Sequence, residues 1–314
     1  DHWNKNVTKP TNTLLLWKGR NLPLISKSHV INLLACSKIW YTATVTDLLK
    51  HYEKIINRNI FTFLWNSKFE PLARAVYINP LRNGGLNITY LKCKIQAIRI
   101  QHIQKLLDDE YSAKWKSFAR YWIGLQLRSF NPNLGLNKFT HTLYVPEFYQ
   151  KCITIFKDFY ENNPDLNFGQ IPTKLFYQRQ LRNYLLEPKI TKLYDLNFIN
   201  IWKNLHNKFL NHITRDVSFK TIYDILPVNY NVFFKNISKF KLCPFCSNIE
   251  TTDHICFECK LKLSLQQLII KWMKKLSRNS FNTFYTFLKF GLIPSGASFP
   301  EPEFKDLCLL ICAE

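Results

Sequence analysis

The stretch from Cys243 to Cys259 constrains the fold of this 314-residue chain more than any other feature. Two residues separate Cys243 from Cys246, seven more precede His254, and four more precede Cys259. Two thiolates at this spacing bind one ion from a tight turn, and an imidazole with a third thiolate completes a tetrahedron that has no open position. A loop this short has almost no core of its own, so the metal contributes much of its folding free energy. The sequence therefore predicts one structural Zn²⁺ bound by Cys243, Cys246, His254 and Cys259.

The remaining cysteines favour packing over metal binding or disulfides. Nine cysteines are an odd number, and a chain of 314 residues does not need disulfides to be stable. Cys256 is an alternative fourth ligand, but it lies only two residues from His254, so Cys259 is favoured. Cys308 and Cys312 are four residues apart in an apolar segment, which favours a buried helix face over a second metal site. Three cysteines stand alone in apolar stretches and are predicted to be small core residues: Cys36, Cys93 and Cys152.

The charge of the chain indicates a polyanionic partner. Forty-three Lys and Arg residues against 22 Asp and Glu residues give a net charge of +21 and an isoelectric point near 9.6. Eight glycines and no glycine-rich phosphate loop argue against a dinucleotide-binding fold. No apolar run of 18 residues and no signal peptide is present in the sequence, so we expect neither membrane insertion nor secretion.

Two amphipathic segments predict a mainly α fold with basic helices. Residues 28–64 and 90–107 carry apolar side chains at steps of three and four residues, with basic side chains on another face. The predicted apolar stripes include Leu49 and Ile55 in the first segment and Ile103 in the second. The alternative for each basic face is a merely solvated surface. The net charge favours phosphate contacts, for which the helical candidates are Lys50, Lys54, Arg58, Lys92 and Arg99.

A series of motifs between residues 17 and 86 resembles a known family. The series runs through Trp17-Lys18-Gly19-Arg20, Trp40-Tyr41, Phe63-Leu64-Trp65, Arg74 and Pro80-Leu81-Arg82-Asn83-Gly84-Gly85-Leu86. It resembles the region after the polymerase palm in reverse transcriptases of non-LTR (LINE-type) retrotransposons. The zinc stretch, with Glu250-Thr251 ahead of His254, is similar to the zinc-binding domain on the C-terminal side of those enzymes. Asn79, Leu81 and Asn87 depart from the family's pattern at the glycine turn.

The resemblance implies a nucleic-acid-binding part of a reverse transcriptase. Such a part clamps the template-primer and binds RNA or target DNA during target-primed reverse transcription, inside a nuclear or cytoplasmic ribonucleoprotein. Its partners are RNA, DNA and the remainder of the reverse transcriptase, with no membrane. Further candidates for nucleic-acid contacts are Arg74 and Arg82 around the glycine turn, and Lys271, Lys274 and Lys275 on a helix after the zinc ligands. Phe245, between two zinc cysteines, either stacks on an unpaired base or packs under the metal loop.

The catalytic carboxylates of a polymerase palm are not recognisable in this sequence. Two-metal polymerisation needs paired aspartates on a hairpin and a third carboxylate. The pair Asp108-Asp109 follows a basic helix and runs into Glu110, so it is interpreted as an acidic helix terminus. We therefore predict no catalytic residues and no polymerisation by this chain alone, within a parent protein that is an RNA-directed DNA polymerase.

Four segments are predicted along the chain. They are a thumb-like basic helical region at 1–110, a helical connector at 111–225, a zinc-binding module at 226–278 and a truncated tail at 279–314. Two other hypotheses remain: a non-catalytic zinc-containing helical adaptor, or a decayed retroelement fragment. Binding to phosphates weakens steeply as salt rises, so salt dependence separates the nucleic-acid hypothesis from the adaptor.

Overall fold

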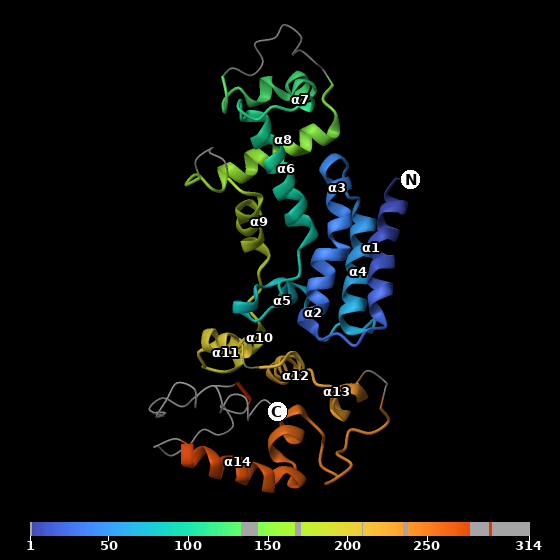
Figure 1. Cartoon of the computed structure of the whole chain (residues 1–314), viewed down its shortest axis with the longest axis vertical. Coiled ribbons are helices and arrows are strands. Elements are labelled where there is room, and N and C mark those ends of the chain that lie inside the picture. The colour runs from blue at the N-terminus through green and yellow to red at the C-terminus, as the bar shows by residue number, and fades with distance from the viewer. Residues whose placement is uncertain are drawn as a thin grey trace. The chain divides into compact units, whose positions relative to one another are not determined.

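A computed structural model describes residues 2–132, 144–166, 171–208, 210–234, 238–276 and 289–290 (Figure 1). Over these ranges the chain is mainly helical, and its one β pairing is an antiparallel bridge between Leu242 and Ile249. This confirms the predicted fold class. None of the helices in these ranges combines the length and the apolar character needed to cross a membrane. The predicted helical stripe at Cys308 and Cys312 lies outside the described residues.

The chain forms two compact units, and each combines stretches that are distant in sequence. Unit 1 contains residues 1–21, 27–70 and 88–186, and unit 2 contains residues 22–26, 71–87 and 187–314. Each unit thus draws on more than one of the four predicted segments. The boundaries of those segments stay predictions.

The first part of unit 1 is a group of packed helices. The elements are α1 (His2–Lys18), α2 (Leu24–His29, shared with unit 2), the π-helical turn η1 (Val30–Ala35), α3 (Ser37–Val45) and α4 (Lys50–Trp65). Helix α1 packs against η1, α3 and α4. Helix α4 ends at Asn66, whose left-handed φ of 50° breaks the helix. The prediction of one apolar stripe is wrong at two positions, because the side chains of Leu49 and Ile55 are exposed.

The second part of unit 1 is built around α6 (Leu91–Leu107). Helices α7 (Trp115–Ile123), α8 (Glu147–Glu161) and α9 (Thr173–Leu181) pack against it around an apolar core. Its fully buried members include Ile100, Ile103 and Leu106 at helical spacing. The predicted helix over 90–107 is confirmed. The side chains of Cys36, Cys93 and Cys152 are fully buried, as predicted for core residues.

The predicted placement of Arg99 on the exposed face of this helix is wrong. Arg99 is 6% exposed and forms an ion pair with Asp47, which also pairs with Lys151 at 2.5 Å. Burial disfavours the charged form of Asp47, but the bonds from Lys151 and Arg99 outweigh it and lower the pKa of that carboxyl. A buried arginine needs such a partner, so Arg99 connects α6 to the segment between α3 and α4.

Unit 2 contains short helices, the glycine turn and the zinc stretch. Its elements are α5 (Arg74–Ile78), the 3-10 turn η2 (Leu81–Asn83), α10 (Lys189–Leu193), α11 (Phe198–Leu205), α12 (His212–Ile222), α13 (Asn229–Phe233), η5 (His254–Glu258), η6 (Lys260–Lys262) and α14 (Leu263–Leu276). The glycine turn after η2 packs against α11. Gly84 has φ of 78°, and an added Cβ there would lie 2.6 Å from the Trp202 ring. An added Cβ at Gly85 would lie 1.9 Å from the carbonyl oxygen of Asn79. The two glycines thus permit close packing inside unit 2.

Candidate metal centre

A short hairpin holds the first two cysteines of the zinc stretch. The bridge between Leu242 and Ile249 closes it, and the N–H of Cys243 donates to the carbonyl of Asn248 at 2.7 Å. The N–H of Ser247 donates back to the carbonyl of Cys243 at 3.0 Å, with Ser247 in the left-handed region at φ of 60°. This tight turn brings both thiols to the same metal position.

The other two ligands come from the helical turn η5 and the residue that follows it. The N–H of His254 donates to the hydroxyl of Thr251 at 3.0 Å, which satisfies a backbone donor at the start of the turn. At its other end the N–H of Cys259 donates to the carbonyl of His254 at 2.8 Å. This backbone hydrogen bond joins the two ligands, and both side chains are buried.

The four side chains are close enough to hold one metal ion. Their ligand atoms all lie within 4.8 Å of one another, with 4.0 Å between the sulfurs of Cys243 and Cys259. The Cys246 sulfur lies 3.1 Å from Nε2 of His254. Zinc bonds of about 2.3 Å to sulfur and about 2.0–2.1 Å to nitrogen place ligand atoms of a tetrahedron about 3.5–3.8 Å apart. Three sulfurs and one imidazole nitrogen therefore fit a closed structural zinc site.

The backbone of the hairpin favours the thiolate of Cys243. The backbone N–H of Phe245 stabilises the thiolate of Cys243 and lowers the pKa of this thiol to about 7. Nε2 of His254 faces the sulfur of Cys246, while its Nδ1 lies 4.0 Å from the carboxylate of Glu258. This distance is longer than a hydrogen bond, so Glu258 lies near the ring without fixing its orientation.

Cys256, the alternative ligand, is not part of this cluster. It is half-buried, and burial raises the pKa of its thiol. The cluster that the structure brings together contains Cys259 instead.

Glu250 joins the metal loop to the rest of unit 2. Its buried carboxylate accepts the backbone N–H of Asn229 at 2.8 Å and the side-chain amide of Asn229 at 3.1 Å. Its carbonyl accepts the N–H of Tyr230 at 3.1 Å. No motif in the sequence indicates this role, because the partner lies 21 residues earlier.

A buried lysine makes a second anchor that no sequence pattern predicts. The ammonium of Lys289 lies 2.7 Å from the carboxylate of Asp253 and 2.9 Å from that of Asp224. Two carboxylates compensate the cost of burying this cation. The position next to the ligand His254 is therefore tied to the end of α12.

Most of the predicted nucleic-acid contacts lie on the surface. Phe245 is 67% exposed at the tip of the metal hairpin, so it does not pack under the loop. The side chains of Lys274 and Lys275 lie outside the described residues, and Arg99 is buried. The exposed basic candidates are Lys50, Lys54, Arg58, Arg74, Arg82, Lys92 and Lys271.

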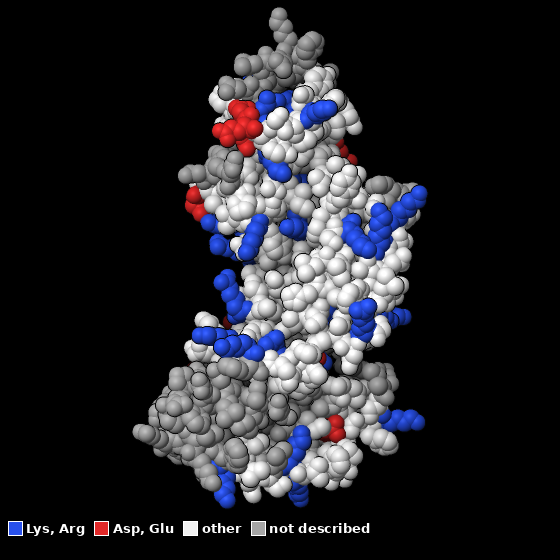
Figure 2. Space-filling model, in the orientation of Figure 1, with Lys and Arg blue, Asp and Glu red and all other residues white. Residues whose placement is uncertain are grey.

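Basic side chains are abundant on the surface. Figure 2 shows Lys and Arg spread over the face that it draws, with few Asp and Glu among them. Charges of one sign that are spaced in this way attract a polyanion over a distance of about 10 Å at moderate salt.

Comparison with known proteins gives one partial similarity. The chain is 30% identical over 105 residues to the Transposon TX1 uncharacterized 149 kDa protein of Xenopus laevis. The match covers 33% of this chain and 8% of that protein. No protein-family model matches the chain. The chain is thus similar in part to a transposon protein.

Proposed function

We propose that this chain is the nucleic-acid-binding C-terminal part of a non-LTR retrotransposon reverse transcriptase. In this proposal its basic helices clamp the template-primer by the backbone, and its metal module binds RNA or target DNA during target-primed reverse transcription. The bound ion is Zn²⁺, and its role is structural. The protein acts inside a nuclear or cytoplasmic ribonucleoprotein with the remainder of the reverse transcriptase.

One observation carries this proposal: a transposon-like chain with a net charge of +21 also holds a closed three-cysteine, one-histidine cluster. A net positive charge of this size favours binding to a polyanion. The similarity to a transposon protein favours nucleic acid over other polyanions. A metal site with four protein ligands has no open position for a reacting water. It can therefore hold a binding surface in place but cannot catalyse hydrolysis.

The parent protein is proposed to be an RNA-directed DNA polymerase whose chemistry lies outside this chain. Asp108 caps the C-terminal end of α6, in keeping with the interpretation of an acidic helix terminus. Asp109 accepts hydrogen bonds from Arg120 at 2.7 Å and from Asn131 at 3.2 Å. The Asp109 carboxylate thus makes structural bonds, which argues against a two-metal site at this pair.

The salt dependence of binding tests the proposal. Fluorescence anisotropy with duplex and single-stranded oligonucleotides gives the slope of affinity against salt concentration. The triple variant Lys50→Glu, Lys54→Glu and Arg58→Glu is expected to flatten that slope by about 0.7–0.9 for each phosphate that is no longer bound.

A matched control keeps the charge at the same positions. Lys50→Arg, Lys54→Arg and Arg58→Lys should leave the slope unchanged. Contacts with the phosphates of a nucleic acid depend more on the charge of the side chain than on its shape. An unchanged slope in the charge-reversed variant would show that this face of α4 is only a solvated surface.

A protein-binding adaptor is the second candidate, and exposed apolar side chains on and just before the metal hairpin favour it. Phe240, Leu242, Phe245 and Ile249 are 70%, 47%, 67% and 53% exposed. Contacts through such side chains depend little on salt. A partner complex that survives high salt while oligonucleotides do not bind would support the adaptor.

A further inference from the structure

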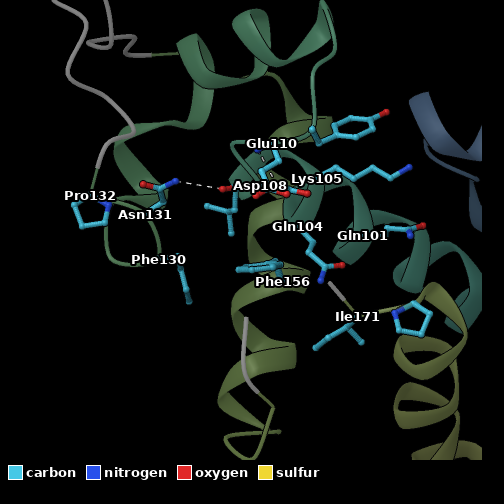
Figure 3. A pocket seen from close by; sticks show the side chains of 13 residues that line it. Gln101, Gln104, Lys105, Asp108, Glu110, Phe130, Asn131, Pro132, Phe156 and Ile171 are labelled. Carbon is cyan, nitrogen blue, oxygen red and sulfur yellow. Dashed lines mark hydrogen bonds between the residues drawn. The ribbon is translucent and has the colours of Figure 1, made fainter. Parts of the chain in front are cut away.

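A pocket in unit 1 lies beside the C-terminal half of α6. The candidate metal site belongs to unit 2 and is more than 70 residues away in the sequence. Its volume is about 730 Å³, within the range of about 300–1,000 Å³ that small-molecule sites occupy. Figure 3 shows its lining, with Asn131 and Pro132 on one side and Gln101 and Ile171 on the other. Nothing in the sequence motifs predicts this pocket.

One face of α6 supplies the polar wall of the pocket. Gln101, Gln104 and Lys105 are spaced by three and four residues, so they lie on one side of the helix, and Asp108 is the residue that ends it. The opposite side carries the buried core residues Ile100, Ile103 and Leu106. This wall combines amide groups, one ammonium and one carboxylate, which offers hydrogen-bond donors and acceptors together.

Neighbouring contacts orient Gln101, Asp108 and the loop after α6. The hydroxyl of Thr173 donates to the amide oxygen of Gln101, which directs the amide nitrogen as a donor. One carboxylate oxygen of Asp108 accepts the N–H of Glu110 at 3.0 Å. The ammonium of Lys116 donates to the carbonyls of Asp108 and Tyr111, which fixes the loop after α6.

Aromatic rings supply the apolar walls. Phe130 packs edge-on against the buried Phe156, with ring centres 5.2 Å apart and an interplanar angle of 82°. The ring of Tyr111 lies 5.2 Å from the ammonium of Lys105 and is 36% exposed. A flat ligand can stack on such rings while the amides contact its edge.

The charges of the pocket lining disfavour a phosphate as its main ligand. Asp108 and Glu110 face one lysine, Lys105, so the lining has more negative than positive charge. A phosphate would be repelled there. A nucleobase is flat and uncharged, and an exocyclic amino group donates well to a carboxylate or an amide oxygen.

We propose that this pocket binds one unpaired nucleobase that carries an exocyclic amino group, namely adenine, cytosine or guanine. Gln104, in the last turn of α6, and Asp108, which ends that helix, contact the edge of the base, and Tyr111 or Phe130 stacks on its face. The phosphates of the strand stay outside the pocket. This inference rests on the proposed nucleic-acid function and gives unit 1 a base contact of its own.

The test uses the zinc-loaded 314-residue chain and oligothymidine probes with one variable central residue. Fluorescence anisotropy compares adenine, cytosine, thymine and an abasic residue at that position. We expect adenine and cytosine to bind better than thymine, and the abasic probe to bind about 5- to 160-fold more weakly than adenine, the range for one stacked base.

Two variants locate the effect in the pocket. Gln104→Trp obstructs the polar wall of the pocket and Gln104→Leu removes the amide, and both should reduce the preference for adenine while the salt slope stays unchanged. Gln150→Trp, at an exposed glutamine on α8, is the matched control and should keep the preference. If both Gln104 variants keep the wild-type preference, the base does not bind here.

The wild-type chain alone also decides the matter if a variant fails to fold. Salt-dependent binding of all four probes with equal affinity would overturn the pocket assignment and leave the proposed function standing. A wild-type chain that binds none of the probes and no duplex would remove the proposed function and this inference with it.

Discussion

The hydroxyl of Tyr223 donates a hydrogen bond of 2.6 Å to the backbone carbonyl of Gly84, although 139 residues separate them. The ring of Tyr223 also stacks on Trp202, with an interplanar angle of 16°, and Trp202 lies against the same glycine. The glycine turn and the end of α12 are therefore held together inside unit 2. The glycine turn, which belongs to the motif series that carries the family resemblance, has a packing role in this structure.

Substitutions at this contact should destabilise unit 2. Tyr223→Phe leaves a buried carbonyl without its donor, at a cost of about 1–3 kcal/mol. Gly84→Ala places a Cβ 2.6 Å from the Trp202 ring at a positive φ, so we expect a loss of about 2 kcal/mol or more. Gly19→Ala is the control, since no atom lies within 4 Å of an added Cβ there. Denaturant unfolding followed by circular dichroism measures all three, and equal stability of the Gly84 and Gly19 variants would contradict the packing role.

Metal analysis of purified protein should find one zinc per chain. Cys259→Ser should lose the metal, because three ligands bind far more weakly than a closed set of four, whereas Cys256→Ser should retain it. Elemental analysis after dialysis gives the stoichiometry, and limited proteolysis reports whether residues 241–259 stay folded. Loss of zinc from the Cys256 variant with retention in the Cys259 variant would reverse the ligand assignment.

Local features can be predicted from this sequence better than long-range ones. The helix over 90–107 and the four-ligand cluster follow from spacing alone, since the ligands lie within 17 residues. Helical periodicity places Arg99 on the exposed face because it does not show that Asp47, 52 residues earlier, lies beside it. The link from Lys289 to Asp253 escapes prediction for the same reason. Such ion pairs depend on packing between elements, which a single sequence does not encode as a pattern.

His102 should make the stability of unit 1 depend on pH. Its ring stacks on Trp115 at 4.2 Å, and burial together with the nearby charge of Lys105 lowers its pKa from 6.5 to about 4. The unfolded chain therefore takes up a proton below pH 6.5 that the folded chain takes up only near pH 4. Stability contributed by the neutral ring is fully present above pH 6.5 and is lost as pH falls toward 4, by up to about 3 kcal/mol at about 1.4 kcal/mol per pKa unit.

Denaturant unfolding between about pH 7 and about pH 4 measures this dependence. His102→Phe keeps an aromatic ring on Trp115 and removes the titrating group, so its stability should fall less over that range. His29→Phe, at an exposed histidine, should follow the wild type. If stability in the His102 variant depends on pH as steeply as in the wild type, the dependence belongs to other groups. One such group is His206, because burial and the nearby charge of Arg215 lower its pKa to about 4.

Phe245→Ala should weaken binding to single strands and leave duplex binding nearly unchanged. The ring is 67% exposed between Cys243 and Cys246, so its loss costs little stability, and stacking requires an unpaired base. We expect single-strand affinity to fall by about 1–3 kcal/mol with an unchanged salt slope, because every phosphate contact is kept. Phe118→Ala is a matched control, since Phe118 is 70% exposed on α7 and lies in unit 1. Anisotropy at several salt concentrations measures the affinity for duplex and for single strand. Equal losses of affinity on both, or no loss at all, would show that Phe245 does not stack on a base. Either result would strengthen the case for a protein partner at the metal hairpin.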